Sequence, residues 1–254
     1  MVPSRLLRWS GLHATIDEDA LVPGAYILSI GGAQQSHVNL AEPADVFYEY
    51  LRRIANVVDL AAPAGAQIRA LHLGAGALTL ARYVAATRPG SVQHAVEQER
   101  ELSDFVLQHL PLPTGADVHH HIGDAREELE QFAPGAFDVV VLDVFAGPES
   151  PPHLTGADFY AEAAKVLAAD GILVVNVGDE PPLSFTRSQV RALEQVVDDV
   201  GALADEPMFS GRYPGNIVLV GVKRPWPAEW TAPLLAAGPH PAAVRTGTDL
   251  DQLR

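Results

Sequence analysis

The chain has 254 residues, 48% of them hydrophobic, which is enough to bury the core of one α/β domain with small additions. Its 17 lysines and arginines against 32 aspartates and glutamates give a formal net charge of −15, which disfavours nucleic acid and anionic membranes as partners. The sequence has no cysteine, so disulfides, thiolate metal sites and a cysteine nucleophile are excluded.

No apolar run reaches the roughly 18 residues that a membrane-spanning helix needs. The first residues, MVPSRLLRWSG, also lack the apolar core of a signal peptide. We therefore expect a cytoplasmic protein.

Residues 1–62 predict a short N-terminal hairpin and a lead-in helix. Segment 26–32 reads YILSIGG and segment 34–40 reads QQSHVNL, two strand-like runs that follow one another across a glycine pair. Apolar residues at helical spacing then run through FYEYLRRIANVVDL, and the helix is expected to end before Pro63.

Residues 63–224 alternate strand and helix, which predicts right-handed crossovers in a parallel sheet. The first elements expected in turn are segments 68–73, 78–86, 92–96, 99–109, 117–122, 125–132 and 137–142. A helix at 156–170, a buried strand at 171–178, a helix at 186–201 and a closing antiparallel pair at 206–211 and 215–222 follow. Residues 225–254 are rich in proline and alanine and are expected to form a tail, packed on the surface or partly mobile.

The most informative segment is 68–76, IRALHLGAG, where an apolar strand runs into Gly74 and Gly76 and then into a helical pattern. Such a turn lets a nucleoside-bearing ligand lie against bare backbone, facing the amides of a helix N-terminus. The same segment also fits a plain tight turn that packs a helix on a sheet. Thr79 stands where the dinucleotide fingerprint has its third glycine, which disfavours NAD but not an adenosyl ligand.

Acidic residues close the next three strand-like runs: Glu97, Asp124 and Asp143. In a parallel sheet these positions meet at the carboxyl edge, where doubly wound folds bind ligands. Glu97 can accept from both ribose hydroxyls, and Asp124 can accept from the exocyclic amine of adenine. Asp124 equally fits an N-cap for the helix that follows, and Asp143 fits a brace for the next loop.

In their order and spacing these residues resemble the spermidine synthase-like (polyamine aminopropyltransferase-like) family, over roughly residues 30–223. The likeness extends to Gln35–Ser36, to FYEYL at 47–51, and to DVFAGPESPPHLTGADFY at 143–160. It implies an α/β, Rossmann-like class I methyltransferase fold. Such a fold has a mostly parallel seven-stranded sheet with helices on both faces, here with a short N-terminal β-hairpin element.

The resemblance also implies a site and a reaction. S-adenosylmethionine or its decarboxylated form would be the co-substrate, held by Gln35, Gly74, Gly76, Glu97, Asp124 and Ala125. Tyr48 and Asp143 would hold a small acceptor, such as an amine, and Asp143 would orient or deprotonate it. The reaction would be aminopropyl or methyl transfer. A homodimer is left open, because the N-terminal element that often supports dimers in the family is abbreviated here.

Two family carboxylates are missing. Ala146 replaces the second aspartate of the catalytic Asp-x-x-Asp pair, and Ala77 replaces the aspartate of the glycine loop. Each charge-assisted contact contributes about 1.5 to 3 kcal/mol, so polyamine aminopropyl transfer would be weakened unless other acids substitute. Asn176, Asp179 and Glu180 are the nearest candidates to do so.

Two other hypotheses stay open, and the missing carboxylates favour the first of them. The first is a non-catalytic protein that keeps the adenosyl pocket as a sensor or scaffold. The second, which Thr79 disfavours, is an NAD-dependent oxidoreductase.

Histidines raise the question of a metal. His119, His120 and His121 are consecutive in a predicted strand, where alternate side chains face opposite ways, so the three cannot converge on one ion. His153 could act as a base near neutral pH, but a lone loop histidine is more often solvated. We expect no metal cofactor.

Overall fold

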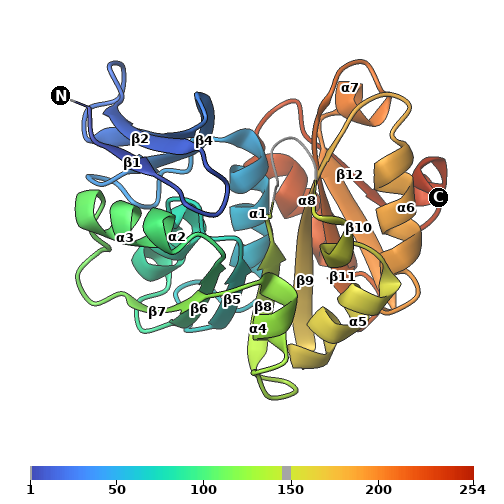
Figure 1. Cartoon of the computed structure of the whole chain (residues 1–254). Helices are drawn as coiled ribbons and strands as arrows, with labels where there is room; N and C mark the ends of the chain where they lie inside the picture. Colours follow the sequence, from blue (N-terminus) through green and yellow to red (C-terminus); the bar gives the residue numbers. More distant parts are fainter. Residues whose placement is uncertain (1, 145–149) are drawn as a thin grey trace.

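The computed structural model describes residues 2–144 and 150–254. Two sheets organise these residues, a smaller one at the N-terminus and a larger one that runs through the rest of the chain (Figure 1).

The N-terminal sheet has four antiparallel strands in chain order: β1 (Ser4–Leu6), β2 (His13–Glu18), β3 (Ala25–Ile30) and β4 (Ala33–Asn39). Strands β3 and β4 are the hairpin predicted from the sequence. The prediction missed β1 and β2. In β2 the run HATIDE buries Ala14 and Ile16 and leaves Thr15 between them more exposed, an alternation too short to stand out.

The main sheet has eight strands in the order β12-β10-β11-β9-β8-β5-β6-β7. They are β5 (Arg69–Leu73), β6 (Val92–Glu97), β7 (Asp117–Ile122), β8 (Phe137–Leu142), β9 (Leu167–Asp179), β10 (Asp199–Ala204), β11 (Gly215–Val222) and β12 (Ala243–Thr246). Strands β9, β8, β5, β6 and β7 pair in parallel, and β12, β10 and β11 join antiparallel. The mostly parallel α/β sheet was predicted; the eighth strand, β12, was not.

Helices cover both faces of this sheet. The α-helices are α1 (Glu49–Leu60), α2 (Thr79–Thr87), α3 (Arg100–His109), α4 (Ala125–Leu129), α5 (Ala157–Val166), α6 (Ser184–Leu193), α7 (Glu206–Phe209) and α8 (Ala228–Ala237). Helices α1, α2 and α8 share one apolar core with the strands, and α4, α5 and α6 share another. Two short 3-10 helices, η1 (Pro152–Leu154) and η2 (Gly247–Leu253), complete the described elements.

The structure corrects the closing part of the sequence prediction. The expected helix at 186–201 ends at Leu193, and residues 199–204 form β10, the antiparallel partner of β11. Segment 206–211, expected to be a strand, begins with the short helix α7 instead. Asp205 caps that helix by accepting from the Met208 amide, and Pro207 suits its first turn.

A third apolar core joins the N-terminal sheet to α2 and α3. Leu7, which follows β1, and Ile16 and Leu28 of the small sheet pack with Phe105 of α3 and with Leu110 at the C-terminal end of that helix. The small sheet, blue in Figure 1, therefore packs on α2 and α3, which are drawn in green.

Within the part of the chain that the structure describes, no helix is both long and apolar enough to cross a membrane. The cytoplasmic location stays a prediction.

Candidate functional site

The site lies where the chain order of the sheet reverses. From β5 the chain moves outward to β6 and β7, and then returns to β8 on the other side of β5. In such sheets ligands bind outside the carboxyl ends of the strands at this reversal. Gly74 follows β5 and Asp143 follows β8, and the Asp143 amide donates to the Leu73 carbonyl at 2.8 Å.

Gly74 is required by this close approach. Its φ is +91°, and a Cβ there would lie 2.2 Å from the Asp143 carbonyl oxygen. Gly76 also has positive φ, +50°, and faces the Ser36 hydroxyl of β4. The glycine turn is thus held between the end of β8 and the N-terminal sheet.

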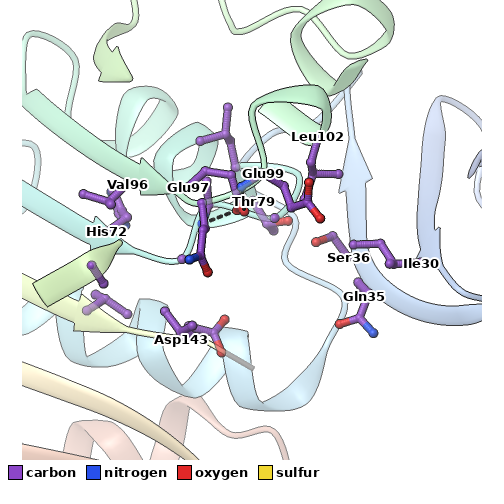
Figure 2. A pocket seen from close by; sticks show the side chains of 18 of the residues that line it. Ile30, Gln35, Ser36, His72, Thr79, Val96, Glu97, Glu99, Leu102 and Asp143 are labelled. Carbon is purple, nitrogen blue, oxygen red and sulfur yellow. Dashed lines mark hydrogen bonds between the residues drawn. The ribbon is translucent and has the colours of Figure 1, made fainter. Parts of the chain in front are cut away.

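A pocket of about 600 Å³ opens at this turn, within the size range of small-molecule sites. Of the residues predicted from the sequence, it is lined by Gln35, Gly74, Gly76, Glu97, Asp124, Ala125 and Asp143. Figure 2 shows Glu97 and Asp143 reaching into it from the sheet edge, with Gln35 and Ser36 facing them from β4. Tyr48 does not line it and lies in a neighbouring cavity.

Glu97 is fixed by the backbone around it. Its carboxylate accepts from the Ala75 amide at 3.4 Å and from the Glu99 amide at 3.0 Å. Burial raises the pKa of Glu97 above its ordinary value, although these amide hydrogen bonds oppose the shift. The side chain still reaches the pocket, so it can accept from hydroxyl groups of a ligand.

Ala77 occupies the position of the family's glycine-loop aspartate. Its side chain is fully buried in the core between the N-terminal sheet and α3. Its amide donates to the Ser36 hydroxyl at 3.1 Å. A carboxylate at this fully buried position would have to be desolvated, so alanine fits the local packing.

Asp124 is the N-cap of α4, as one of its sequence interpretations requires, because it accepts from the Arg126 amide at 2.9 Å. It also lines the pocket, and its contact with adenine stays a prediction. Its other oxygen contacts Nε2 of His153 at 2.7 Å. Burial acts to raise its pKa, but the hydrogen bonds from His153 and the helix amides outweigh it and hold the pKa of Asp124 below the ordinary value.

Asp143 sits in a desolvated polar network. Burial raises its pKa to about 6, while hydrogen bonding by Asn176 and Tyr50 opposes the shift. Asn176 Nδ2 donates to the carboxylate at 2.8 Å, and Asn216 Nδ2 in turn donates to Asn176 Oδ1 at 3.1 Å. A carboxyl group with this pKa is mostly ionised at neutral pH and can accept a proton.

A second cavity, of about 500 Å³, adjoins the first. Gln35 and Tyr50 line both. Tyr48, Glu49 and Asp205 line the second one, which gives it acidic character, although Arg53 pairs with Glu49 at 3.3 Å.

Sequence reasoning missed Tyr50 and Asn216 and assigned Asn176 only by topology. The available signal for Asn176 was a lone amide inside the apolar run ILVVNVG, where a buried polar group needs a partner. Asp179 is occupied elsewhere, because its carboxylate accepts from the Thr186 amide at 2.7 Å. Glu180 is exposed, and Ala146 lies outside the described residues, as do Phe145 and Pro148.

The histidines of β7 alternate between the two faces of the sheet, as predicted: His120 contacts Ser103, and His121 lies on the opposite face. His94 of β6, which the sequence analysis did not consider, contacts His121 at 2.8 Å. No group of three or more histidine, aspartate or glutamate side chains able to hold a metal ion occurs within residues 2–144 and 150–254.

No protein-family model matches the chain. Two curated relatives are named polyamine aminopropyltransferase. One, from Vibrio vulnificus, is 27% identical over 110 residues, covering 42% of this chain and 37% of the relative, so that match spans little more than a third of its length. The other, from Chromobacterium violaceum, is 23% identical over 201 residues, covering 78% of this chain and 72% of the relative.

Solved structures share this fold over most or all of the chain. A probable spermidine synthase from Corynebacterium glutamicum has a TM-score of 0.89 and 29% identity, covering 100% of this chain and 94% of that one. A spermidine synthase bound to the transition-state analogue AdoDATO has a TM-score of 0.65 at 15% identity, with coverage of 91% and 75%. Human methyltransferase-like protein 13 bound to SAH has a TM-score of 0.57 at 18% identity, with coverage of 74% and 87%.

Proposed function

We propose, on the premise that the chain is a spermidine synthase-like protein of the class I methyltransferase fold, that it is an adenosyl-dependent transferase. It would bind S-adenosylmethionine or decarboxylated S-adenosylmethionine and pass a methyl or aminopropyl group to an amine or another small acceptor. The observation that carries the proposal is the convergence of Glu97 and Asp143 on one pocket beside the Gly74 turn.

The nucleoside would lie along the first cavity. Gly74 and Gly76 leave open backbone on its floor, Glu97 would accept from the ribose hydroxyls, and Asp124 with Ala125 would border the adenine. Gln35 would reach the sulfonium end from β4. Support comes from the pocket's volume and from the adenosyl ligands named for two proteins of the same fold, SAH and AdoDATO.

Transfer would need little covalent help from the protein. The acceptor's lone pair attacks the carbon next to the sulfonium, the carbon–sulfur bond breaks, and a neutral thioether leaves. The acceptor's proton passes to the Asp143 carboxylate, whose pKa near 6 suits a base at neutral pH. Tyr50 and Asn176 hold that carboxylate in place, so positioning is the protein's main contribution.

The second cavity would receive the far end of the acceptor. It meets the first at Tyr50 and Gln35, and Tyr48, Glu49 and Asp205 line it. Carboxylates favour a cationic amine there. Arg53 already pairs with Glu49, which offsets part of this negative charge, and the Tyr213 hydroxyl donates to Asp205. An acceptor with one cationic group at its far end therefore suits the cavity better than one with several.

A non-catalytic adenosyl-binding protein is the second candidate. Ala77 and Ala146 favour it, because each stands where the family has a carboxylate. Both candidates use the first cavity, and they differ in whether Asp143 accepts a proton.

Calorimetry with S-adenosylmethionine, its decarboxylated form and 5′-methylthioadenosine tests the shared part. We expect micromolar binding of at least one, and binding by none would reject both candidates. Incubation with the bound co-substrate and an amine panel including putrescine, read by mass spectrometry, separates them. Product that disappears in Asp143→Asn supports the transferase, whereas no product with any amine supports the scaffold.

A further inference from the structure

We propose that the turn between β1 and β2 is part of the nucleoside site, with Trp9 covering the bound nucleoside and Glu99 as the residue that positions it. This inference rests on the proposed function. It assigns a role to two residues that the resemblance to the family left unassigned.

The turn is fastened to the rim of the pocket by one carboxylate. Glu99 accepts from the Ser10 amide at 2.7 Å and from the Trp9 amide at 3.3 Å, although about 90 residues separate them in sequence. The side chain of Glu99 is buried, and the residue is only 7% exposed. A buried carboxylate needs hydrogen-bond partners, and it finds them in this turn.

The turn is also closed on itself and anchored at its base. The Leu7 amide donates to the Leu12 carbonyl at 2.8 Å, and the Gly11 amide donates to the Leu7 carbonyl at 2.9 Å. Leu7 is 1% exposed and belongs to the core shared with α3. The position of the Trp9 backbone is therefore set by the fold.

The Trp9 side chain has no comparable packing. It is 66% exposed, yet Trp9, Ser10 and Leu12 all line the first cavity. A large exposed aromatic group beside a concave site gains contact area when a ligand fills that site. Sugar and base faces of a nucleoside offer such area, and indole binds both well.

One residue links this turn to the carboxylate expected to hold ribose. The Glu99 amide donates to Glu97 Oε1 at 3.0 Å, while the Glu99 side chain holds the amides of Trp9 and Ser10. Figure 2 shows Glu97 and Glu99 next to each other at the pocket. Moving Glu99 would therefore disturb both the floor and the cover of the nucleoside site.

Tryptophan fluorescence gives a direct test. The chain has three tryptophans, and Trp226 and Trp230 pack against each other in the C-terminal segment with ring centroids 5.6 Å apart. Titration with 5′-methylthioadenosine is expected to change the emission of the wild-type protein. The change should vanish in Trp9→Phe and persist in Trp226→Phe.

Affinity measured by calorimetry completes the experiment. Trp9→Ala is expected to raise the Kd for 5′-methylthioadenosine about tenfold, since stacking on one aromatic ring contributes on this scale. Glu99→Gln is expected to weaken binding and to reduce the Trp9 emission change. Leu21→Ala serves as the matched control, because Leu21 is 88% exposed in another turn of the same sheet and does not line the cavity.

The outcomes separate the two proposals. Calorimetric binding with an unchanged Kd in Trp9→Ala and no Trp9 emission change would overturn this inference and leave the proposed function standing. No calorimetric binding of any adenosyl compound by the wild-type protein would overturn both. Circular dichroism of each variant verifies that a loss of binding does not come from a loss of fold.

Discussion

The ionised carboxylate of Asp143 lowers the stability of the fold, although the proposed transfer requires it. Burial raises its pKa from 3.8 to about 6. Between those two pH values the folded protein binds more protons than the unfolded one, so its stability falls as pH rises through this window. Above pH 6 the full penalty of the buried charge is present.

Asp143→Asn is therefore expected to stabilise the fold at pH 8 while abolishing transfer. The amide keeps the shape and can still accept from Asn176, so the gain in unfolding free energy should be about 1 to 2 kcal/mol. Urea denaturation at pH 8 and pH 4 measures it. The gain should shrink towards pH 4, where the wild-type carboxyl is protonated, and an equal gain at both pH values would contradict the assigned pKa.

Tyr50 tunes the same carboxyl group. Its hydrogen bond lowers the pKa of Asp143 against the larger effect of burial. Tyr50→Phe should therefore raise that pKa further and move the acidic limb of the kcat/KM profile to higher pH. Tyr48→Phe is the matched control, because Tyr48 lines only the second cavity and its hydroxyl donates to Gln34. An unshifted limb in Tyr50→Phe would remove Tyr50 from the mechanism.

At the scale of elements, the sequence predicted the parts whose patterns are local. The strand, the glycine turn and the helix at 68–86 were correctly predicted because an apolar run meets two glycines and then a helical period. Strand β10 was missed because its run DVGALA continues an apolar helical pattern without a break. Its pairing with β11 and β12, a tertiary effect, decides its conformation.

In the site, too, the features that follow from local sequence patterns were predicted and those set by tertiary contacts were missed. The acids at the ends of β6, β7 and β8 line one pocket, as the topology of a parallel sheet predicts, while their roles towards a ligand stay predictions. Tyr50 was missed because a tyrosine at helical spacing fits a packed helix face as well as a polar network. Which side chain of α1 reaches Asp143 depends on the residue at which the helix begins, and sequence patterns do not fix helix ends to a single residue.

The turn after β5 gives a prediction at this scale. Gly74→Ala would place a methyl group against the Asp143 carbonyl in a left-handed conformation, so unfolding free energy should drop by about 3 kcal/mol or more. Gly65→Ala is the matched control, because Gly65 also has positive φ but has nothing within 4 Å of an added Cβ. It should lose only about 1 kcal/mol. Equal losses in the two variants would show that the close approach of β5 and β8 is unimportant.

At the scale of the whole molecule, both sheets contribute residues to the pocket. Its floor is the edge of the main sheet, one wall is β4, and part of its rim is the turn after β1. The packing of the N-terminal sheet on α2 and α3 is what brings these parts together. A domain boundary near residue 62 would therefore separate residues that form one site.

The C-terminal residues 225–254 are also packed into the rest of the fold. Trp230 and Leu234 of α8 pack in the core of α1, and β12 pairs with β10 at the sheet edge. The buried Asn56 of α1 donates to the Gly238 carbonyl at 2.8 Å. Deleting this segment would expose apolar surface, open a strand edge and leave a buried amide without a partner.

We therefore expect a chain ending at residue 224 to lose cooperative thermal unfolding, as measured by circular dichroism. Two single substitutions in α8 measure how much its buried face contributes to stability without removing the whole segment. Leu234 is 2% exposed, and Leu234→Ala should lower the unfolding free energy of the protein by about 2 to 4 kcal/mol. Leu235 is 38% exposed, and Leu235→Ala should lower the unfolding free energy by less than about 1 kcal/mol. If the shortened chain kept the wild-type Tm and both substitutions were neutral, residues 225–254 would be an independent tail, and the edge of the sheet would be stable without β12.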